Sequence, residues 1–180
     1  MASAEPTRQI DLDAVIGSGD ENRIVDALDA IGRSRASSAE RSRIMELARK
    51  TRSPQIRNAA AIAVADLGVD GADQLLIDLI KRKESRGANG TLLYALREMN
   101  AYVPLPVLID IITEDRTYEA LEGVLDIIAN NAAKYEAKEK AEAVSRMKPL
   151  LTSTDAHTGH TAKLAIKYLT RRSGRRPLAR

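Results

Sequence analysis

The chain has 180 residues, with 28 lysine and arginine residues against 25 aspartate and glutamate residues, and it contains no cysteine. The absence of cysteine excludes disulfides, thiolate metal sites and a cysteine nucleophile, and no apolar run approaches the roughly 18 residues that a membrane span needs. Five of the basic residues are arginines within residues 171–180, so the rest of the chain carries 23 basic and 25 acidic residues and the basic character belongs to the C-terminal tail.

The N-terminal region predicts a short first helix pair. Residues 1–9 are small and polar, and we expect them to be disordered. The pair is expected over residues 12–16 and 20–31, separated by a Gly-Ser-Gly break. Gly32 is expected just beyond the second helix, at the position where a glycine commonly ends a helix.

A second pair follows with clearer helix boundaries. Ser37 and Glu40 have the spacing of a capping box. Ser53 followed by Pro54 predicts the start of the next helix, because proline at the first helical position sacrifices no hydrogen bond. Gly68 is expected to end that helix.

The third pair is expected over residues 70–83 and 86–99, with a polar turn between the two helices. In the fourth pair, Pro104 and Pro106 fall within the first turn of one helix. Asp115 is expected to cap the second helix of that pair.

The fifth pair is expected over residues 134–151 and 155–170. Its first helix carries alternating charges, which are typical of a face exposed to solvent. Residues 171–180 form a basic tail that lacks apolar periodicity and is expected to be flexible.

One pattern returns in all five pairs: an apolar pair, a gap of two residues and one more apolar residue. The second member of the apolar pair falls at positions 28, 64, 96, 125 and 166, which gives steps of 36, 32, 29 and 41 residues. Each step is long enough for two helices and two turns. The sequence therefore predicts an all-α fold, a right-handed α-solenoid of about five antiparallel helix pairs that forms one domain over residues 10–170.

Residues 56–68, IRNAAAIAVADLG, resemble the second helix of a HEAT repeat. In that family a branched residue and an arginine open the inner helix, as Ile56 and Arg57 do here, and a glycine ends it, as Gly68 does. Steps near 30 residues are similar to the short HEAT-like repeats of the phycobilin lyase type. The resemblance implies the solenoid fold over about residues 20–170, and it transfers no bilin site or activity to this chain.

The chain offers few candidates for catalysis or metal binding. His157 and His160 lie near Asp155 at a helix start, and such a set could hold Zn²⁺, but no third or fourth ligand is evident and a solvated helix start is the simpler interpretation. The glycine-containing stretches 17–19 and 87–90 lack the Lys-Ser/Thr of a phosphate-binding loop. We predict no metal, no cofactor and no catalytic residues.

The side of the inner helices that faces away from the core is the best candidate for a binding surface. Its predicted partner-binding residues are Asn58, Ile62, Asp66, Tyr94, Arg97, Glu98, Glu119 and Glu122. Tyr94 and Ile62 carry the most weight, because exposed aromatic and apolar groups serve as interface anchors. Burial of either by a neighbouring helix is the alternative.

The sequence thus favours a cytoplasmic, non-enzymatic module that binds another protein through the concave face of the solenoid, as an adaptor, an inhibitor or a subunit of a complex. The main alternative is a nucleic-acid-binding module whose contacts are Arg171, Arg172, Arg175 and Arg176. A third possibility is an enzyme or a lyase-associated subunit that uses a groove for a small molecule.

Overall fold

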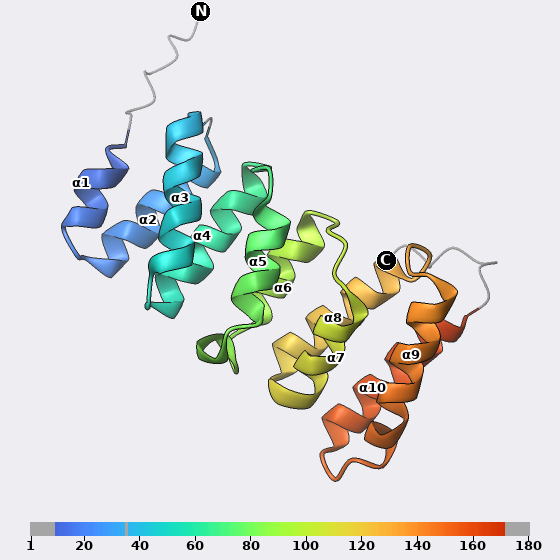
Figure 1. Ribbon diagram of the computed structural model, residues 1–180. Coiled ribbons are helices and arrows are strands. Elements are labelled where there is room, and N and C mark those ends of the chain that lie inside the picture. Colours follow the sequence, from blue (N-terminus) through green and yellow to red (C-terminus); the bar gives the residue numbers. More distant parts are fainter. Residues whose placement is uncertain (1–9, 35, 172–180) are drawn as a thin grey trace, which may run out of the picture. The chain divides into compact units, whose positions relative to one another are not determined.

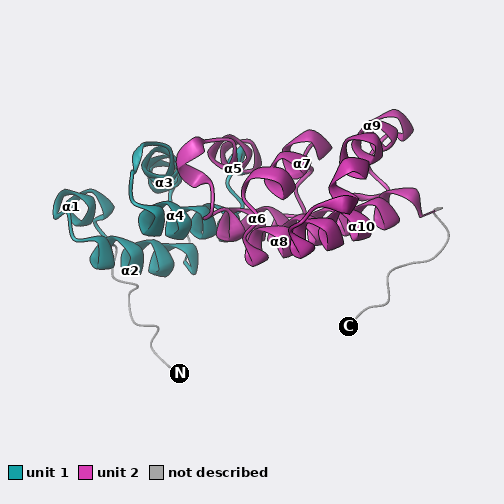
Figure 2. Ribbon diagram, turned by 90° about the horizontal axis from the view of Figure 1, so that it is seen from below, with its two compact units in different colours: residues 1–72 teal, residues 73–180 magenta. Residues whose placement is uncertain are grey.

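The computed structural model describes residues 10–34 and 36–171 (Figure 1). Within these ranges the chain forms ten α-helices and no strand, which confirms the all-α prediction. Contacts divide the chain into two compact units, residues 1–72 and residues 73–180 (Figure 2). The single domain over residues 10–170 stays a prediction, and the flexibility predicted at residues 1–9 and in the tail beyond Arg171 falls outside the described residues.

Unit 1 contains the first four helices. They are α1 (Leu12–Gly17), α2 (Glu21–Gly32), α3 (Ser38–Lys50) and α4 (Pro54–Asp66). The predicted capping box is confirmed, since Ser37 N donates to Glu40 Oε2 at 2.7 Å and Glu40 N donates to Ser37 Oγ at 3.2 Å. Ser53 caps α4 as predicted, and Gly68 follows the end of that helix at a φ of 57°.

Unit 2 contains the other helices of the described chain. They are α5 (Ala72–Ile80), which begins at the last residue of unit 1, α6 (Gly90–Glu98), α7 (Leu105–Glu114), α8 (Tyr118–Asn131), α9 (Ala137–Met147) and α10 (Ala156–Thr170). Two short 3₁₀ helices, Lys83–Ser85 and Lys148–Thr152, follow α5 and α9. No helix of the two described ranges combines the length and the apolar character that crossing a membrane requires.

Each unit arranges its helices in two layers (Figure 2). In unit 1, α1 and α3 form one layer while α2 and α4 form the other. In unit 2, α5, α7 and α9 form one layer while α6, α8 and α10 form the other. Within the even-numbered layers α2 packs on α4, α6 packs on α8, and α8 packs on α10. Each successive pair therefore contributes one helix to each layer, as the repeats of a solenoid do.

The repeated apolar pattern marks core positions, with a small change of register in the last two pairs. Leu28, Val64 and Leu96 are fully buried, whereas Leu125 and Ile166 are only half-buried. In all five copies the preceding residue of the apolar pair is buried. The pattern therefore identifies the buried face of each even-numbered helix, and the α8 and α10 faces are rotated slightly about their axes.

The linker between α5 and α6 is longer than predicted. The sequence places helices at residues 70–83 and 86–99, but α5 ends at Ile80 and α6 begins only at Gly90. Gly87 has a φ of 77°, a left-handed conformation that an α-helix does not accommodate, so the chain leaves the helical path before Asn89.

Two further boundary predictions are wrong. Asp115 does not cap α8. Thr117 occupies the N-cap position, and Arg116, at a φ of 56°, turns the chain so that Asp115 Oδ1 instead accepts a hydrogen bond from Thr117 Oγ1 at 2.8 Å. The predicted helix over residues 134–151 is shorter, because α9 starts at Ala137 and the chain tightens into a 3₁₀ helix near Pro149, which lacks a backbone N–H.

Gly32 plays a different role from the predicted one. It is the last residue of α2 rather than the residue beyond the helix, and its φ is not positive. A Cβ atom at this position would lie 3.2 Å from Ala63 Cα in α4. Glycine here therefore allows α2 and α4 to approach closely, since an added Cβ atom would require Ala63 to shift.

A network of polar contacts fixes the segment that leads into α7. The hydroxyl of buried Tyr135 donates to the Val103 carbonyl at 3.0 Å, and the Asn131 amide donates to the Ala101 carbonyl at 3.1 Å. Tyr102 donates to Glu139 at 2.9 Å. Glu139 also accepts from the backbone N–H of Leu105, the first residue of α7, at 3.3 Å, so a side chain of α9 satisfies an otherwise unpaired donor of α7.

We expect this network to make the fold sensitive to alkaline pH. Burial raises the pKa of Tyr135 above its ordinary value of 10.0. The unfolded chain therefore loses this proton at a lower pH than the folded chain, and the free energy of unfolding falls by up to ~1.4 kcal/mol per pH unit above about pH 10. In Tyr135→Phe that slope should diminish, at a cost of ~1 kcal/mol near neutrality. Urea denaturation from about pH 8 to about pH 11.5 measures both, and equal alkaline slopes in the two proteins would contradict the assignment.

Candidate functional site

Helices α6 and α8 of unit 2 pack against each other at two glycines. A Cβ atom on Gly90 would lie 2.8 Å from Glu119 Cβ, and a Cβ atom on Gly123 would lie 2.8 Å from Leu93 Cβ. The contact positions advance together along both helices, so α6 and α8 run in the same direction. This close contact determines which side chains of the two helices become neighbours on the solvent side.

On the solvent side, four residues form what we call the Tyr94–Arg97 cluster: Tyr94, Arg97, Glu98 and Asp126. The Arg97 guanidinium lies 4.8 Å from the centroid of the Tyr94 ring, within the range of a cation–π interaction. Its Nη1 atom donates to Asp126 Oδ2 at 2.9 Å, and its Nη2 atom donates to Glu98 Oε1 at 3.0 Å. These carboxylates, Asp126 first, raise the pKa of Arg97. The arginine is therefore held in one orientation while the Tyr94 side chain stays 46% exposed.

Acidic residues continue this surface along α8. Glu119, Glu122 and Asp126 are all exposed, at a spacing that places them on one side of the helix. Tyr118 is 60% exposed, and its hydroxyl donates to Glu122, an interaction that raises the pKa of Tyr118. The α6–α8 surface therefore presents two tyrosines and one arginine among four acidic side chains.

The structure brings together five of the eight predicted partner-binding residues. Tyr94, Arg97 and Glu98 lie on α6, beside Glu119 and Glu122 on α8. The sequence interpretation missed Asp126 and Tyr118. The step of 29 residues between these two repeats places Asp126 opposite Arg97, so the repeat arithmetic contained the signal for that ion pair.

The other three predicted residues belong to unit 1. Asn58, Ile62 and Asp66 follow one another along one side of α4. Asp66 is exposed, whereas Asn58 and Ile62 are half-buried, and the Arg57 guanidinium donates to Asn58 Oδ1 at 3.1 Å. The continuity of these residues with Tyr94, which belongs to unit 2, stays a prediction.

The predicted nucleic-acid contacts fall mostly outside the described residues. Arg171 is exposed at the end of α10, and Arg172, Arg175 and Arg176 lie beyond the described range. At the start of α10, Asp155 acts as a cap and accepts hydrogen bonds from His157 N at 3.1 Å and Thr158 Oγ1 at 2.5 Å. These bonds, that from Thr158 first, lower the pKa of Asp155, and they give this carboxylate a role in helix capping.

Comparison with known proteins supports the fold class. No protein-family model matches the chain, and no curated protein matches it. Among solved structures, the chain is similar to a designed armadillo repeat protein, YIII(Dq)4CqI, with 17% sequence identity and a TM-score of 0.52, over 88% of this chain and 80% of that chain. The chain is thus an α-helical repeat solenoid. The likeness does not distinguish HEAT from armadillo repeats, so the HEAT subtype stays a prediction.

Proposed function

We propose that this chain is a non-enzymatic protein-binding module, and that it binds its partner through the α6–α8 surface. Repeat solenoids typically present extended surfaces to other proteins. The observation that supports this surface is the Tyr94–Arg97 cluster. Tyrosine and arginine are enriched among the residues that dominate binding energy, and an arginine already held by Asp126 and Glu98 loses little conformational freedom on binding.

The charges around the cluster suggest the chemistry of the partner. Two carboxylates, those of Glu98 and Asp126, contact Arg97, and two more, those of Glu119 and Glu122, lie exposed further along α8. A partner with basic groups around a central apolar or hydrogen-bonding patch complements this arrangement, whereas a polyanion such as nucleic acid is repelled by it. We therefore place the partner among proteins, whether the complex makes this chain an adaptor, an inhibitor or a permanent subunit.

We expect the double variant Tyr94→Ala and Arg97→Ala to weaken partner binding by ~2 kcal/mol or more, about 30-fold in Kd. Both side chains reach the surface, so helix content should not change. The measurement is a quantitative affinity pull-down followed by titration of the retained protein. A matched control is Glu136→Lys, at the N-cap of α9, combined with Lys138→Glu in its first turn, which alters exposed charges in the other helix layer.

The control also defines the opposite result. Full affinity in the double variant together with lost binding in the α9 variant would place the site on the odd-numbered helices. Binding that disappears after nuclease treatment and falls steeply with salt would instead support the nucleic-acid alternative.

A further inference from the structure

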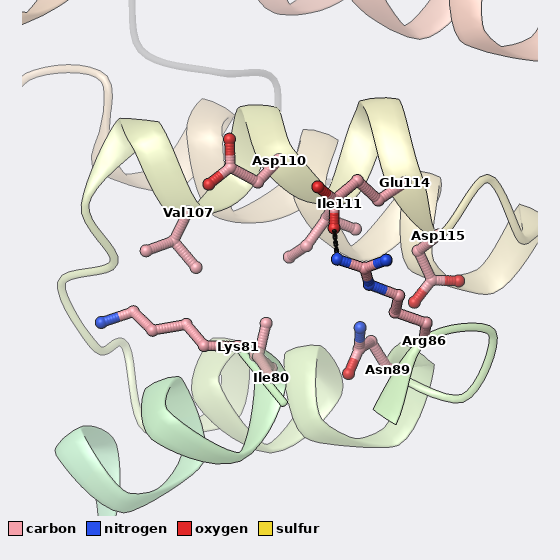
Figure 3. Close-up of a pocket in the computed structure, with 9 residues that line it drawn as sticks. All are labelled: Ile80, Lys81, Arg86, Asn89, Val107, Asp110, Ile111, Glu114 and Asp115. Carbon is pink, nitrogen blue, oxygen red and sulfur yellow. Dashed lines mark ion pairs between the residues drawn. The ribbon is translucent and has the colours of Figure 1, made fainter. Parts of the chain in front are cut away.

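Unit 2 contains a second feature, a pocket between the end of α5, the loop that follows it, and α7 (Figure 3). Its cavity volume is about 230 Å³. Ile80, Val107 and Ile111 supply apolar walls, and all three are buried. The polar lining residues are Lys81, Arg86, Asn89, Asp110, Glu114 and Asp115. This pocket lies outside the α6–α8 surface, on side chains that the sequence interpretation did not select.

Two hydrogen-bond acceptors in the pocket lining have no partner among the described residues. They are Asn89 Oδ1 and Asp115 Oδ2, both buried. Asn89 as a whole is only 2% exposed. A buried acceptor without a donor costs free energy, so the lining favours any group that brings donors. In Figure 3 the Arg86 side chain passes between Asn89 and Asp115 toward Glu114.

The ion pairs in the pocket lining leave one negative charge without a basic partner. Arg86 Nη2 lies 2.6 Å from Glu114 Oε2, and Arg146 Nη2 lies 2.7 Å from Asp110 Oδ1. Two of the three carboxylates in the lining are thus paired, whereas the one partner of the Asp115 carboxylate among the described residues is the hydroxyl of Thr117. The five charged lining residues, two basic and three acidic, have a formal net charge of −1. An incoming cation therefore fits better than an anion.

The size and walls of the pocket restrict the occupant further. Pockets for drug-sized ligands have volumes of roughly 300–1,000 Å³, so this one suits a single long side chain. An apolar stem would lie against Ile80, Val107 and Ile111, and a head with several donors would reach Asp115 and Asn89. Arginine has this form, and its planar head donates to two acceptors at once.

We infer that this pocket binds an arginine side chain of a partner protein. The inference rests on the proposal that the chain binds a protein, and it adds a separate contact on the α5–α7 side of unit 2. Both acceptors are buried in the unbound chain and the Arg86 side chain lies between Asn89 and Asp115 in Figure 3, so the inference requires Arg86 to swing aside for the ligand. Its side chain is 50% exposed and joined to Glu114 by a surface ion pair, which makes this movement inexpensive.

The test uses a short capped peptide, acetyl-Gly-Arg-Gly-amide, added to the full chain. Binding is followed by NMR through the Asn89 side-chain amide and the methyl groups of Ile80 and Ile111. The same peptide with citrulline, a neutral isostere of arginine, should bind at least about tenfold more weakly, because the charge-assisted bond to Asp115 is lost. Equal binding of the citrulline peptide, or no shift with the arginine peptide, would overturn the inference.

Two variants test the role of each lining residue. Asp115→Asn should weaken binding of the arginine peptide at least about tenfold, while it keeps the side-chain oxygen that accepts from Thr117. Arg86→Ala should strengthen binding of the arginine peptide by about fivefold, because it removes a positive charge that repels the peptide and leaves Glu114 unpaired. The matched control for Arg86→Ala is Lys83→Ala, which removes an exposed charge from the same loop outside the pocket and should leave affinity unchanged. Unchanged binding in both Asp115→Asn and Arg86→Ala would show that the peptide binds elsewhere.

A third set of measurements distinguishes a protein partner from a small molecule as the source of the guanidinium group. It also tests the pocket inference separately from the proposed function. Agmatine carries the same head without a peptide backbone, and tighter binding of agmatine than of the peptide would identify a small-molecule site and overturn the protein-partner inference. The variant Tyr94→Ala with Arg97→Ala should bind the peptide normally, because it leaves the pocket intact. If the arginine peptide binds the pocket but no partner protein binds the α6–α8 surface, only the proposed function is refuted. If a partner protein binds that surface but the peptide does not bind the pocket, only the pocket inference is refuted.

Discussion

Replacement of Leu96 by alanine is expected to lower the free energy of unfolding by ~2–5 kcal/mol. Leu96 lies in α6 and is 0% exposed, so the substitution removes buried methyl groups and leaves a cavity that packed neighbours fill only in part. Chemical denaturation monitored by circular dichroism measures the loss. Because typical domains are stable by only ~5–15 kcal/mol, this single change should remove a large share of the total.

Leu151→Ala provides the matched control, since the same atoms are deleted from a side chain that is 45% exposed in the 3₁₀ helix after α9. We expect a loss of less than ~0.5 kcal/mol there. Equal losses in the two variants would show that Leu96 is not in a packed core, and would contradict the register assigned to the repeated apolar pattern.

That register is the part of the fold that the sequence predicts best. Leu28, Val64 and Leu96 recur at repeat spacing and are fully buried, because a helix that packs on one side must present apolar residues with its own periodicity. The starts of α3 and α4 were also predicted correctly. Ser37 and Ser53 cap these helices through bonds to residues close by in the sequence, so a local pattern is enough to identify them.

Two of the wrong boundaries have a common physical origin. At Asp115 and at Gly87 the local pattern is compatible with a helix or a cap, but the observed path follows a left-handed φ at Arg116 and Gly87. Arg116 is a residue type that seldom adopts this conformation, so propensity alone favours the wrong structure. Tertiary contacts such as that between Tyr135 and Val103 also set where α9 can begin, and these contacts join residues that are 32 positions apart.

The candidate sites divide in the same way. The pairing of Tyr94 with Arg97 was predictable from a spacing of three residues on one helix, and the partner Asp126 from the repeat step. The arginine pocket was not predictable. Its defining features, the unpaired oxygens of Asn89 and Asp115, arise from where two loops place individual atoms, and no periodic pattern in the sequence encodes that.

Gly123 links the packing of unit 2 to its proposed binding surface, and we expect Gly123→Val to destabilise the fold by ~2–3 kcal/mol. A Cβ atom at this position meets Leu93 Cβ at 2.8 Å, and Leu93 is fully buried. Because the obstructing atom is attached directly to the backbone, no side-chain rotation relieves the contact and α6 must move away from α8. The gain in helix propensity over glycine is only a few tenths of a kcal/mol and does not compensate.

The same displacement should also weaken partner binding, because it separates Arg97 from Asp126 and releases the arginine from its fixed orientation. Gly17→Val is the matched control. Gly17 is also helical, no atom lies within 4 Å of an added Cβ, and both stability and affinity should stay close to those of the parent chain. Denaturation and titration with the partner captured by the parent chain measure the two effects. A Gly123→Val chain that unfolds more easily yet binds with full affinity would show that binding does not depend on the α6–α8 contact, and would separate the Tyr94–Arg97 cluster from the function proposed for it.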